Sequence, residues 1–324
     1  MKAAALLEPG NIGLIDTAEP NCGTEDVVLR MLGVGLCGTD MGVVRGERTA
    51  PRHPWVLGHE GVGEIVAVGD SVDNSHLGRR VALEPNYCCL RCRECKSGFT
   101  SGCSDRIAVG LGTPGVLSEY VAAPAEFVHP AADHVNVRDL VCAEPLTVAR
   151  SAVRRSGVTT DDRCLVVGAG SQGLFLCVWL VAAGITPFVQ EPHPGRHELA
   201  LSLGALPIER ADGHVDHVFE TSGVPSALGT ALRHAVAGAT VTLIGMGGEP
   251  LGLSERHVVN RQLSLVGSLI YDHPDDFADT IDALGGLAPR RVLGAEFGLA
   301  DTAAAFDAVA ATSGKVWVNI DGAA

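Results

Sequence analysis

The sequence predicts an α/β protein with two domains, one rich in β-strands and one built on a doubly wound parallel sheet. The chain has 324 residues, 46% of them hydrophobic, which is long and apolar enough to bury two cores. The sequence pattern changes near Val148. Before this point, short β-branched runs are separated by Gly and Pro, and after it helical and strand patterns alternate. Alternation of this kind is typical of βαβ units and therefore of a parallel sheet.

The first part of the chain predicts several short strands. The opening residues MKAAALLEPG lack the apolar region and the cleavage site of a signal peptide, and they predict a strand that ends in a Pro-Gly turn. Further strands are expected at Val27–Leu29, Gly63–Val68 and Tyr120–Ala122, where β-branched residues are frequent.

The second part predicts helices and strands in turn. These are expected, in order, at Val148–Ser156 (helix), Arg163–Val167 (strand), Leu174–Ala183 (helix), Phe188–Gln190 (strand), Asp275–Leu284 (helix) and Val316–Ile320 (strand).

Charge and hydropathy exclude some classes of partner. Acidic residues outnumber basic ones by 38 to 24, which gives a formal charge of -14 without a basic cluster, so we expect no binding to nucleic acid. The longest apolar run, Leu174–Val189, is shorter than a membrane span and contains Gly184 and Pro187. We therefore expect no membrane partner and a soluble, cytoplasmic protein.

A cluster of cysteines predicts a structural zinc site. The residues Cys89, Cys92, Cys95 and Cys103 have the spacing C-x2-C-x2-C-x7-C, within a lobe of about residues 88–104. Four thiolates can close a tetrahedron around zinc and leave no position for a substrate. Cysteines spaced for a metal rather than for disulfides fit a reducing compartment. The neighbouring Cys88 has no assigned role.

A second set of possible metal ligands is dispersed along the chain. His59 and Glu60 follow Gly58 at a turn, and Cys37 lies upstream in the run GVGLCGTD. A catalytic zinc needs about three protein ligands and one open position, so Cys37 and His59 require a third donor. Either Glu60 or Glu144 can supply it, and the spacing leaves Cys142 open as an alternative.

Two residues next to Cys37 are candidates for supporting roles. Asp40 can orient the imidazole of His59. Thr39 can accept the proton of a substrate hydroxyl and pass it on.

A glycine-rich loop predicts a dinucleotide site. The strand ending at Val167 runs into Gly168-Ala169-Gly170-Ser171-Gln172-Gly173 and then into an apolar helix. Gly168 permits the tight turn, Gly170 allows the backbone to approach a pyrophosphate, and Gly173 allows close packing of helix and strand. The N–H groups of the loop and of the helix N-terminus, including those of Ser171 and Gln172, are free for the phosphates.

The end of the next strand favours NAD over NADP. Glu191 lies where an acidic side chain can accept hydrogen bonds from both ribose hydroxyls, and its charge would repel a 2′-phosphate. Arg196 instead favours NADP, because a guanidinium can pair with the 2′-phosphate. Ser222 and Gly245 are further candidates for contacts with the cofactor. The segment from Gly204 to Val215 is too short for a crossover helix, so we expect one helix to be missing there.

These motifs resemble those of the zinc-containing medium-chain alcohol dehydrogenases. The run GHEGVGEIVAVGDSV matches the zinc signature of that family, and GLCGTD, the four-cysteine lobe, the Glu-Pro-Leu run at Glu144 and GAGSQG occur in the family's order. The resemblance spans nearly the whole chain. It is greatest to the polyol, sugar and threonine dehydrogenase branch, where glutamate stands in place of a cysteine ligand, and aminocyclitol dehydrogenases are also similar.

The resemblance implies a GroES-like catalytic domain interrupted by a Rossmann domain. The expected boundaries are 1–147 with 274–324 for the catalytic domain and 148–273 for the Rossmann domain. It also implies two zinc ions per chain, with Cys37, His59 and Glu144 as catalytic ligands and Glu60 ligating or exchanging with water. Thr39 would contact the substrate oxygen. A homo-oligomer, dimer or tetramer, is expected, with the strand Leu263–Val266 as a candidate edge.

Two positions depart from the family pattern. A histidine of the family's proton relay is replaced by Gly42, so protons must leave by another route. The arginine of the sorbitol enzymes aligns roughly with Ser268, which argues against sorbitol as the substrate. We expect hydride transfer between a polar secondary alcohol and NAD. A simple alcohol or threonine dehydrogenase, or a non-catalytic protein with the same fold, is the alternative.

Overall fold

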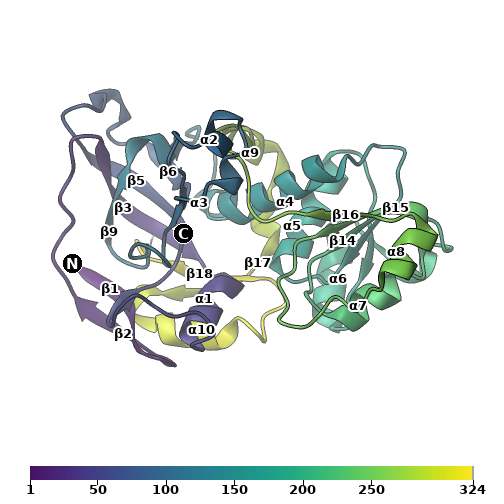
Figure 1. The fold of residues 1–324 in the computed structure, drawn as a ribbon. Coiled ribbons are helices and arrows are strands. Elements are labelled where there is room, and N and C mark those ends of the chain that lie inside the picture. The colour runs from purple at the N-terminus through teal and green to yellow at the C-terminus, as the bar shows by residue number, and fades with distance from the viewer. Residues whose placement is uncertain (323–324) are drawn as a thin grey trace. The chain divides into compact units, whose positions relative to one another are not determined.

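The computed structural model describes residues 1–322 and divides into two compact units. The first comprises Met1–Glu144 and Asp272–Ala324, and the second comprises Pro145–Tyr271. The chain therefore leaves the first unit once and returns to it (Figure 1).

The first unit is built around a seven-stranded sheet. Its order is β10 (Val128–Pro130), β6 (Arg80–Leu83), β5 (Glu60–Val68), β3 (Asp26–Gly35), β18 (Lys315–Asn319) and β17 (Leu293–Gly298), and β9 (Tyr120–Pro124) also pairs with β3. All pairs are antiparallel except β17 with β18. A three-stranded sheet has the order β2 (Asn11–Asp16), β1 (Lys2–Glu8) and β4 (Trp55–Val56).

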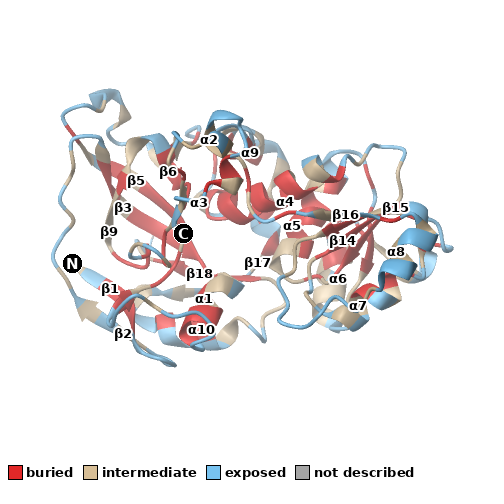
Figure 2. Ribbon diagram, in the orientation of Figure 1, coloured by how far each residue is buried: buried red, intermediate tan, exposed pale blue. Residues whose placement is uncertain are grey.

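The central strands of this unit carry buried apolar residues. In β3, Leu29 and Val34 are fully buried, and in β18 Val318 is fully buried as well. These strands share one core with Leu6 of β1, and Figure 2 shows the buried surface concentrated on the central strands. The strands predicted at Val27–Leu29, Gly63–Val68, Tyr120–Ala122 and Val316–Ile320 are confirmed.

Short helices complete the first unit. They are α1 (Gly38–Val44), α2 (Arg93–Lys96), α3 (Val137–Leu140), α9 (Asp275–Leu287) and α10 (Thr302–Ala308), and the N-terminus of α4 (Ala143–Ser156) begins in it. The cysteine lobe contains α2 and the strand pair β7 (Asn86–Tyr87) with β8 (Ile107–Ala108).

The second unit contains a six-stranded parallel sheet. Its order is β13 (Leu206–Pro207), β12 (Phe188–Gln190), β11 (Cys164–Val167), β14 (Val215–Glu220), β15 (Ala235–Leu243) and β16 (Ser264–Gly267). In sequence order this is 3-2-1-4-5-6, the arrangement of the Rossmann fold. All four residues of β11 are fully buried, as expected for the central strand of a sheet covered on both faces.

The helices of this unit follow the strands. They are α5 (Ser171–Ala182), α6 (Pro194–Ser202), α7 (Pro225–Ala231) and α8 (Glu255–Arg261), together with most of α4. Between β13 and β14 the described chain has only the 3-10 turn Ile208–Arg210, so the crossover helix predicted to be missing is indeed absent. The strand β16 lies at the edge of the sheet, and its role in an oligomer stays a prediction.

Within residues 1–322, no helix combines the length and the apolar character needed to cross a bilayer.

Candidate functional site

The centre of the site is Cys37, placed where β3 ends and α1 begins. Cys37 is the N-cap residue of α1, and its own N–H donates to Asp40 Oδ2 at 3.1 Å. Asp40 therefore closes the first turn of the helix onto its start. This carboxylate, which is 2% exposed, therefore stabilises the start of the short helix α1.

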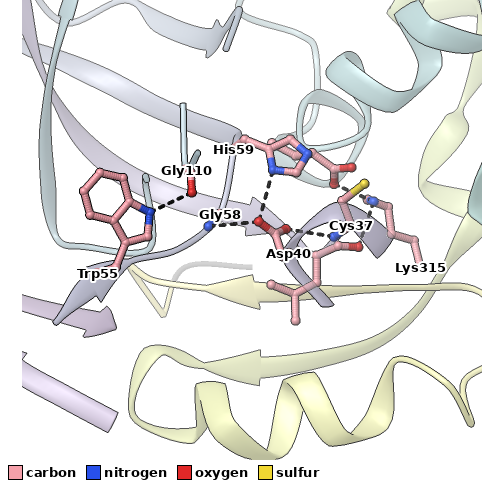
Figure 3. A network of polar contacts seen from close by, with 9 residues as sticks. Cys37, Asp40, Trp55, Gly58, His59, Gly110 and Lys315 are labelled. Atoms are coloured by element: carbon pink, nitrogen blue, oxygen red, sulfur yellow. Dashed lines mark hydrogen bonds and ion pairs between the residues drawn. The ribbon is translucent and has the colours of Figure 1, made fainter. Parts of the chain in front are cut away.

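Asp40 also fixes the second possible ligand. Its Oδ1 lies 3.1 Å from His59 Nδ1 and accepts the N–H of Gly58 at 3.2 Å (Figure 3). With Nδ1 engaged, the Nε2 atom of His59 is available to a metal, as in the carboxylate–histidine–metal arrangement. The predicted role of Asp40 in orienting His59 is confirmed.

The three side chains of Cys37, His59 and Glu60 converge. Each offers one ligand atom, and these atoms lie within 4.8 Å of one another. His59 and Glu60 are consecutive because Glu60 opens β5, whose first residue pairs with Gly35 of β3. The antiparallel register of β3 and β5 thus brings two segments of the chain, one at Cys37 and one at His59, to the same place.

Glu60 has a partner that the sequence did not suggest. Lys315 Nζ, at the start of β18, lies 2.5 Å from Glu60 Oε2 and donates to the carbonyl oxygen of Leu36 at 3.1 Å. Both side chains are 1% exposed. This contact is a buried ion pair that engages Oε2, while Oε1 is buried without a hydrogen-bond partner and is the oxygen open to a further ligand.

The charges of this cluster act on one another. Burial disfavours the imidazolium of His59, but Asp40 and Cys37 outweigh it and place the pKa of His59 well above its usual range. Burial likewise acts against the charged forms of Asp40 and Lys315. Contact with His59 nevertheless lowers the pKa of Asp40, and Glu60 raises the pKa of Lys315. A cation at Cys37, His59 and Glu60 would take the place of the proton on His59.

Of the other candidate donors, Glu144 and Cys142 differ in their surroundings. Glu144 is 7% exposed in the first turn of α4, and its role as a ligand stays a prediction. Cys142 is fully buried, and its thiol donates to the carbonyl oxygen of Arg138 at 3.4 Å. Burial raises the pKa of Cys142 well above its usual range, so this thiol is a poor source of thiolate.

Residues expected to contact the substrate lie on α1. Thr39 is half-buried in the first turn of the helix, next to Cys37. Gly42 lies one turn further, where an added Cβ would meet only Arg48 and Glu47 at 3.6 Å. A side chain has room at this position, but no relay group occupies it.

The cysteine lobe brings its four predicted ligands together. The sulfur atoms of Cys89, Cys92, Cys95 and Cys103 lie within 4.8 Å of one another. Backbone N–H groups of Cys89, Cys92 and Cys95 point at sulfur atoms of the same set at 3.3 to 3.4 Å. The N–H groups of Arg91 and Cys92 lower the pKa of Cys89 to about 6, which favours the thiolate that zinc requires. Burial instead raises the pKa of Cys88, which is outside the set.

In the second unit, the glycine loop has the geometry of a phosphate-binding turn. Gly168 has φ +88°, and an added Cβ on Gly173 would lie 1.9 Å from the carbonyl oxygen of Gly168. Gly170 caps α5 and has open space where its side chain would be. At the same turn, Ser171 Oγ is buried without a hydrogen-bond partner, so its hydroxyl can donate to a polar ligand such as a pyrophosphate.

The remaining cofactor candidates surround this loop. Glu191 is half-buried and accepts N–H groups from Ala169 at 2.7 Å and His193 at 2.8 Å. Arg196 lies in the first turn of α6. Ser222 and Gly245 both lie against Glu220, a buried carboxylate that accepts the N–H groups of Ser222 and Gly223. Sequence reasoning missed Glu220, because a single acidic residue at a strand end has no distinctive spacing.

Comparison with known proteins gives the family. A family model described as the alcohol dehydrogenase GroES-like domain matches residues 23–133, and one described as zinc-binding dehydrogenase matches residues 173–285. A protein of Arthroderma otae named probable D-xylulose reductase A is 30% identical over 315 residues, with 89% of this chain and 88% of that protein covered. The chain belongs to the zinc-containing medium-chain alcohol dehydrogenases. It is an oxidoreductase of the alcohol and polyol dehydrogenase class, and the expected GroES-like and Rossmann folds are confirmed.

Other relatives of this dehydrogenase differ in substrate and cofactor. An L-threonine 3-dehydrogenase of Pectobacterium carotovorum is 28% identical over 350 residues, with 99% of each chain covered. The RspB alcohol dehydrogenase of Escherichia coli CFT073, solved with NADH, superposes with a TM-score of 0.90 at 26% identity over 99% of both chains. A zinc-binding dehydrogenase of Sinorhizobium meliloti, solved with NADP, has a TM-score of 0.88 at 26% identity over 98% of both chains.

Proposed function

We propose that this dehydrogenase transfers hydride from the carbinol carbon of a polar secondary alcohol to NAD. The substrate would be a polyol, a sugar or an aminocyclitol. The observation that carries the proposal is the convergence of Cys37, His59 and Glu60 beside Thr39, since thiolate, imidazole and carboxylate form a donor set that zinc accepts. With the cysteine lobe, this makes two zinc ions per chain.

Each residue of the site has its own role. Zinc held by these residues would supply polarisation of an alcohol oxygen, and a bound nicotinamide would supply the hydride acceptor. Asp40 holds the imidazole of His59 in one orientation and tautomer. Lys315 balances the charge of Glu60, which we propose ligates or exchanges with water, with Glu144 as a further ligand. The Thr39 hydroxyl accepts the proton of the substrate hydroxyl and gives up its own in turn. With Gly42 in the relay position, the released proton leaves by a route that does not use a histidine there.

The relatives support polar substrates and leave two classes in competition. The relative from Arthroderma otae is named as a D-xylulose reductase, which favours a polyol. The relative from Pectobacterium carotovorum, which aligns over 99% of both chains, is named as an L-threonine 3-dehydrogenase. L-threonine, a secondary alcohol with polar substituents, is therefore the second candidate substrate.

A substrate panel separates these candidates. Purified holoenzyme would be assayed for nicotinamide reduction at 340 nm with polyols, sugars, aminocyclitols, L-threonine and simple primary alcohols, with NAD and NADP in parallel. We expect the highest kcat/KM for a polyol, sugar or aminocyclitol with NAD. A clear preference for L-threonine would establish the second candidate. Turnover of none of these substrates, with both zinc ions present, would contradict the proposal.

The choice of NAD rests on Glu191. This carboxylate lies at the end of β12 and is held toward Gly168 and Ala169 by the N–H of Ala169. A negative charge there would accept ribose hydroxyls and repel a 2′-phosphate. Glu191→Ala should lower the preference for NAD over NADP by about tenfold or more, since roughly 1.4 kcal/mol corresponds to a factor of ten. Glu198→Ala is the matched control, because it removes an exposed carboxylate from helix α6, which follows Glu191. An unchanged preference in Glu191→Ala would mean that the ribose is recognised elsewhere.

A further inference from the structure

A third cluster of metal-type ligands lies apart from both zinc sites. It consists of Glu84, His129 and His273, whose ligand atoms lie within 4.8 Å of one another. His129 Nε2 is 2.8 Å and His273 Nδ1 is 2.9 Å from the same atom, Glu84 Oε2. The geometry points to a third zinc site, structural in role, that neither the sequence motifs nor the family relationship assigns. It does not depend on the proposed substrate or cofactor.

Three segments of the first unit supply the ligands. Glu84 directly follows β6, and His129 lies in β10, which pairs with β6 so that the N–H of Glu84 donates to the carbonyl oxygen of Phe127 at 2.8 Å. His273 immediately precedes α9 and is held by its own N–H, which donates to Thr100 Oγ1 at 2.6 Å. All three ligands therefore sit on backbone that is fixed by other hydrogen bonds.

The cluster is buried and has one carboxylate at its centre. The side chain of Glu84 is 1% exposed, that of His129 is 12% and that of His273 is 9%. Within the described chain, the ion pairs of Glu84 are with these two histidines alone. A buried carboxylate is costly unless a positive charge lies beside it. A divalent cation bound by the three side chains would supply that charge.

The two oxygens of Glu84 differ in a way that hydrogen bonding alone does not explain. Both histidines contact Oε2 through a ring nitrogen, while Oε1 is buried with no hydrogen-bond partner. Leaving a buried acceptor without a partner costs about 1–3 kcal/mol. A metal ion bound by the two ring nitrogens and the carboxylate would give this side chain a partner that can engage either oxygen.

The donor set and its surroundings select zinc. Two imidazoles and one carboxylate form a known zinc ligand set, in which neighbouring ligand atoms lie roughly 3.3 Å apart. The present separations of 2.8 and 2.9 Å would therefore widen by about half an ångström. Aromatic rings enclose the cluster, because Phe127 stacks on His273 at 4.6 Å and Phe277 on His129 at 4.7 Å between ring centroids. With these rings packed against both imidazoles, we assign the ion a structural role, for which Glu84 Oε1 can supply the fourth donor.

An ion at this position would anchor the segment at which the chain re-enters the first unit. Asp272 and His273 are the first residues after the second unit, and they bind the cysteine lobe through Ser101 and Thr100. His273 already joins this segment to the end of β6 through Glu84, and a metal would add a direct link to His129 of β10. Metal binding to the folded chain alone stabilises the fold, so the loop before α9 would become more rigid.

The test compares zinc content between variants of the complete chain. Wild type, Glu84→Gln and His129→Gln would be dialysed against micromolar zinc, washed free of unbound metal and analysed by mass spectrometry of the metals. We expect each variant to hold one zinc ion per chain fewer than the wild type. His217→Gln is the control, since His217 is a buried histidine 3.5 Å from Asp162 outside the cluster, and it should keep the wild-type content. Equal zinc content in wild type and Glu84→Gln would overturn the proposal.

A second measurement does not depend on the variants being folded. Crystals of the wild-type protein grown with micromolar zinc would be measured on both sides of the zinc absorption edge. We expect an anomalous peak among Glu84, His129 and His273 in addition to any peaks at the other two sites. A map without this peak, a peak that appears only at millimolar zinc, or a peak at the edge of another metal would each overturn the assignment.

Discussion

The two zinc-type clusters of this dehydrogenase, the cysteine lobe and the Cys37 cluster, form in opposite ways. The lobe takes its four ligands from one short segment, and its backbone N–H groups bind the sulfur atoms of the same segment. The Cys37 cluster takes its groups from the end of β3, the start of β5 and the start of β18. The metal would organise the lobe, whereas the sheet organises the Cys37 cluster before any metal binds.

This difference predicts different consequences of losing a ligand. In a loop with few apolar contacts, the metal supplies most of the free energy that orders the chain. In a sheet whose strands are buried, the fold survives the loss of the metal and the chemistry does not.

Replacing a lobe ligand should disorder the lobe. Cys92→Ser removes one of four thiolates, and by analogy with zinc fingers the metal is worth on the order of 10 kcal/mol to such a structure. We expect loss of one zinc ion and rapid proteolysis within residues 88–104, measured by metal analysis and by mass spectrometry of the fragments. Cys22→Ser is the control, since the Cys22 thiol donates to the carbonyl oxygen of Asp26 and belongs to none of the metal-type clusters among residues 1–322. A lobe that remains resistant to protease in Cys92→Ser would show that packing orders it instead.

Replacing a ligand of the Cys37 cluster should abolish turnover and leave the fold intact. His59→Ala removes a proposed ligand of the metal, whose polarisation of the substrate oxygen would be worth several kcal/mol. We expect kcat to fall by at least about 10³-fold, because each 1.36 kcal/mol is a factor of ten. The circular dichroism spectrum and the protease resistance of the lobe should match the wild type. The exposed His53→Ala is the control, and activity of His59→Ala within a factor of ten of wild type would remove His59 from the ligand set.

The buried ion pair beside the Cys37 cluster should contribute to stability more than an exposed one does. Lys315→Met leaves the Glu60 carboxylate buried without its partner, and breaking such a pair costs about 3–5 kcal/mol. Lys2→Met removes an exposed pair with Asp16, whose side chains are 53% and 79% exposed, and should lower stability far less, because solvent screens that pair. Urea unfolding of both variants gives the comparison. Equal midpoints for the two variants would show that Glu60 does not depend on Lys315.

The thiol of Cys89 in the lobe should differ in its pH dependence from those of Cys164 and Cys177 in the second unit. The pKa of Cys89 is lowered to about 6 by backbone N–H groups, whereas burial raises the pKa of Cys164 and of Cys177 to about 12. After chelation at pH 7.5, iodoacetamide should alkylate Cys89 as a thiolate and leave the other two unlabelled. At lower pH, protons compete with zinc for Cys89, so the affinity of the lobe for zinc should fall. Peptide mass spectrometry measures the labelling, and labelling of Cys164 before Cys89 would contradict these assignments.

Sequence reasoning succeeded where the signal is local. The spacing of the four lobe cysteines and the strand, glycine loop and helix around Gly168 each lie within one short segment, so composition and period are enough to identify them. The missing crossover helix before Val215 was also predictable, because a connection of that length cannot hold a helix.

The side chains that the sequence did not reveal as neighbours come together only through the fold. Lys315 lies beside Glu60 only because β18 inserts next to β3, and no pattern around Lys315 indicates this. The same is true of Glu220, which organises the loop at Ser222 and Gly223. Glu84, His129 and His273 are single polar residues in three separate segments, and the pairing of β6 with β10 brings only two of them near each other.

The position of β18 in the sheet has a consequence for synthesis of the protein. The strand lies between β3 and β17 and carries Lys315, yet the whole of the second unit precedes it in the chain. As the ribosome makes the chain, Cys37, His59 and Glu60 emerge early, and the carboxylate of Glu60 has no cation beside it until the second unit has been made. The Rossmann domain can fold as a continuous segment during that interval. The catalytic unit thus matures last, although its residues are translated first.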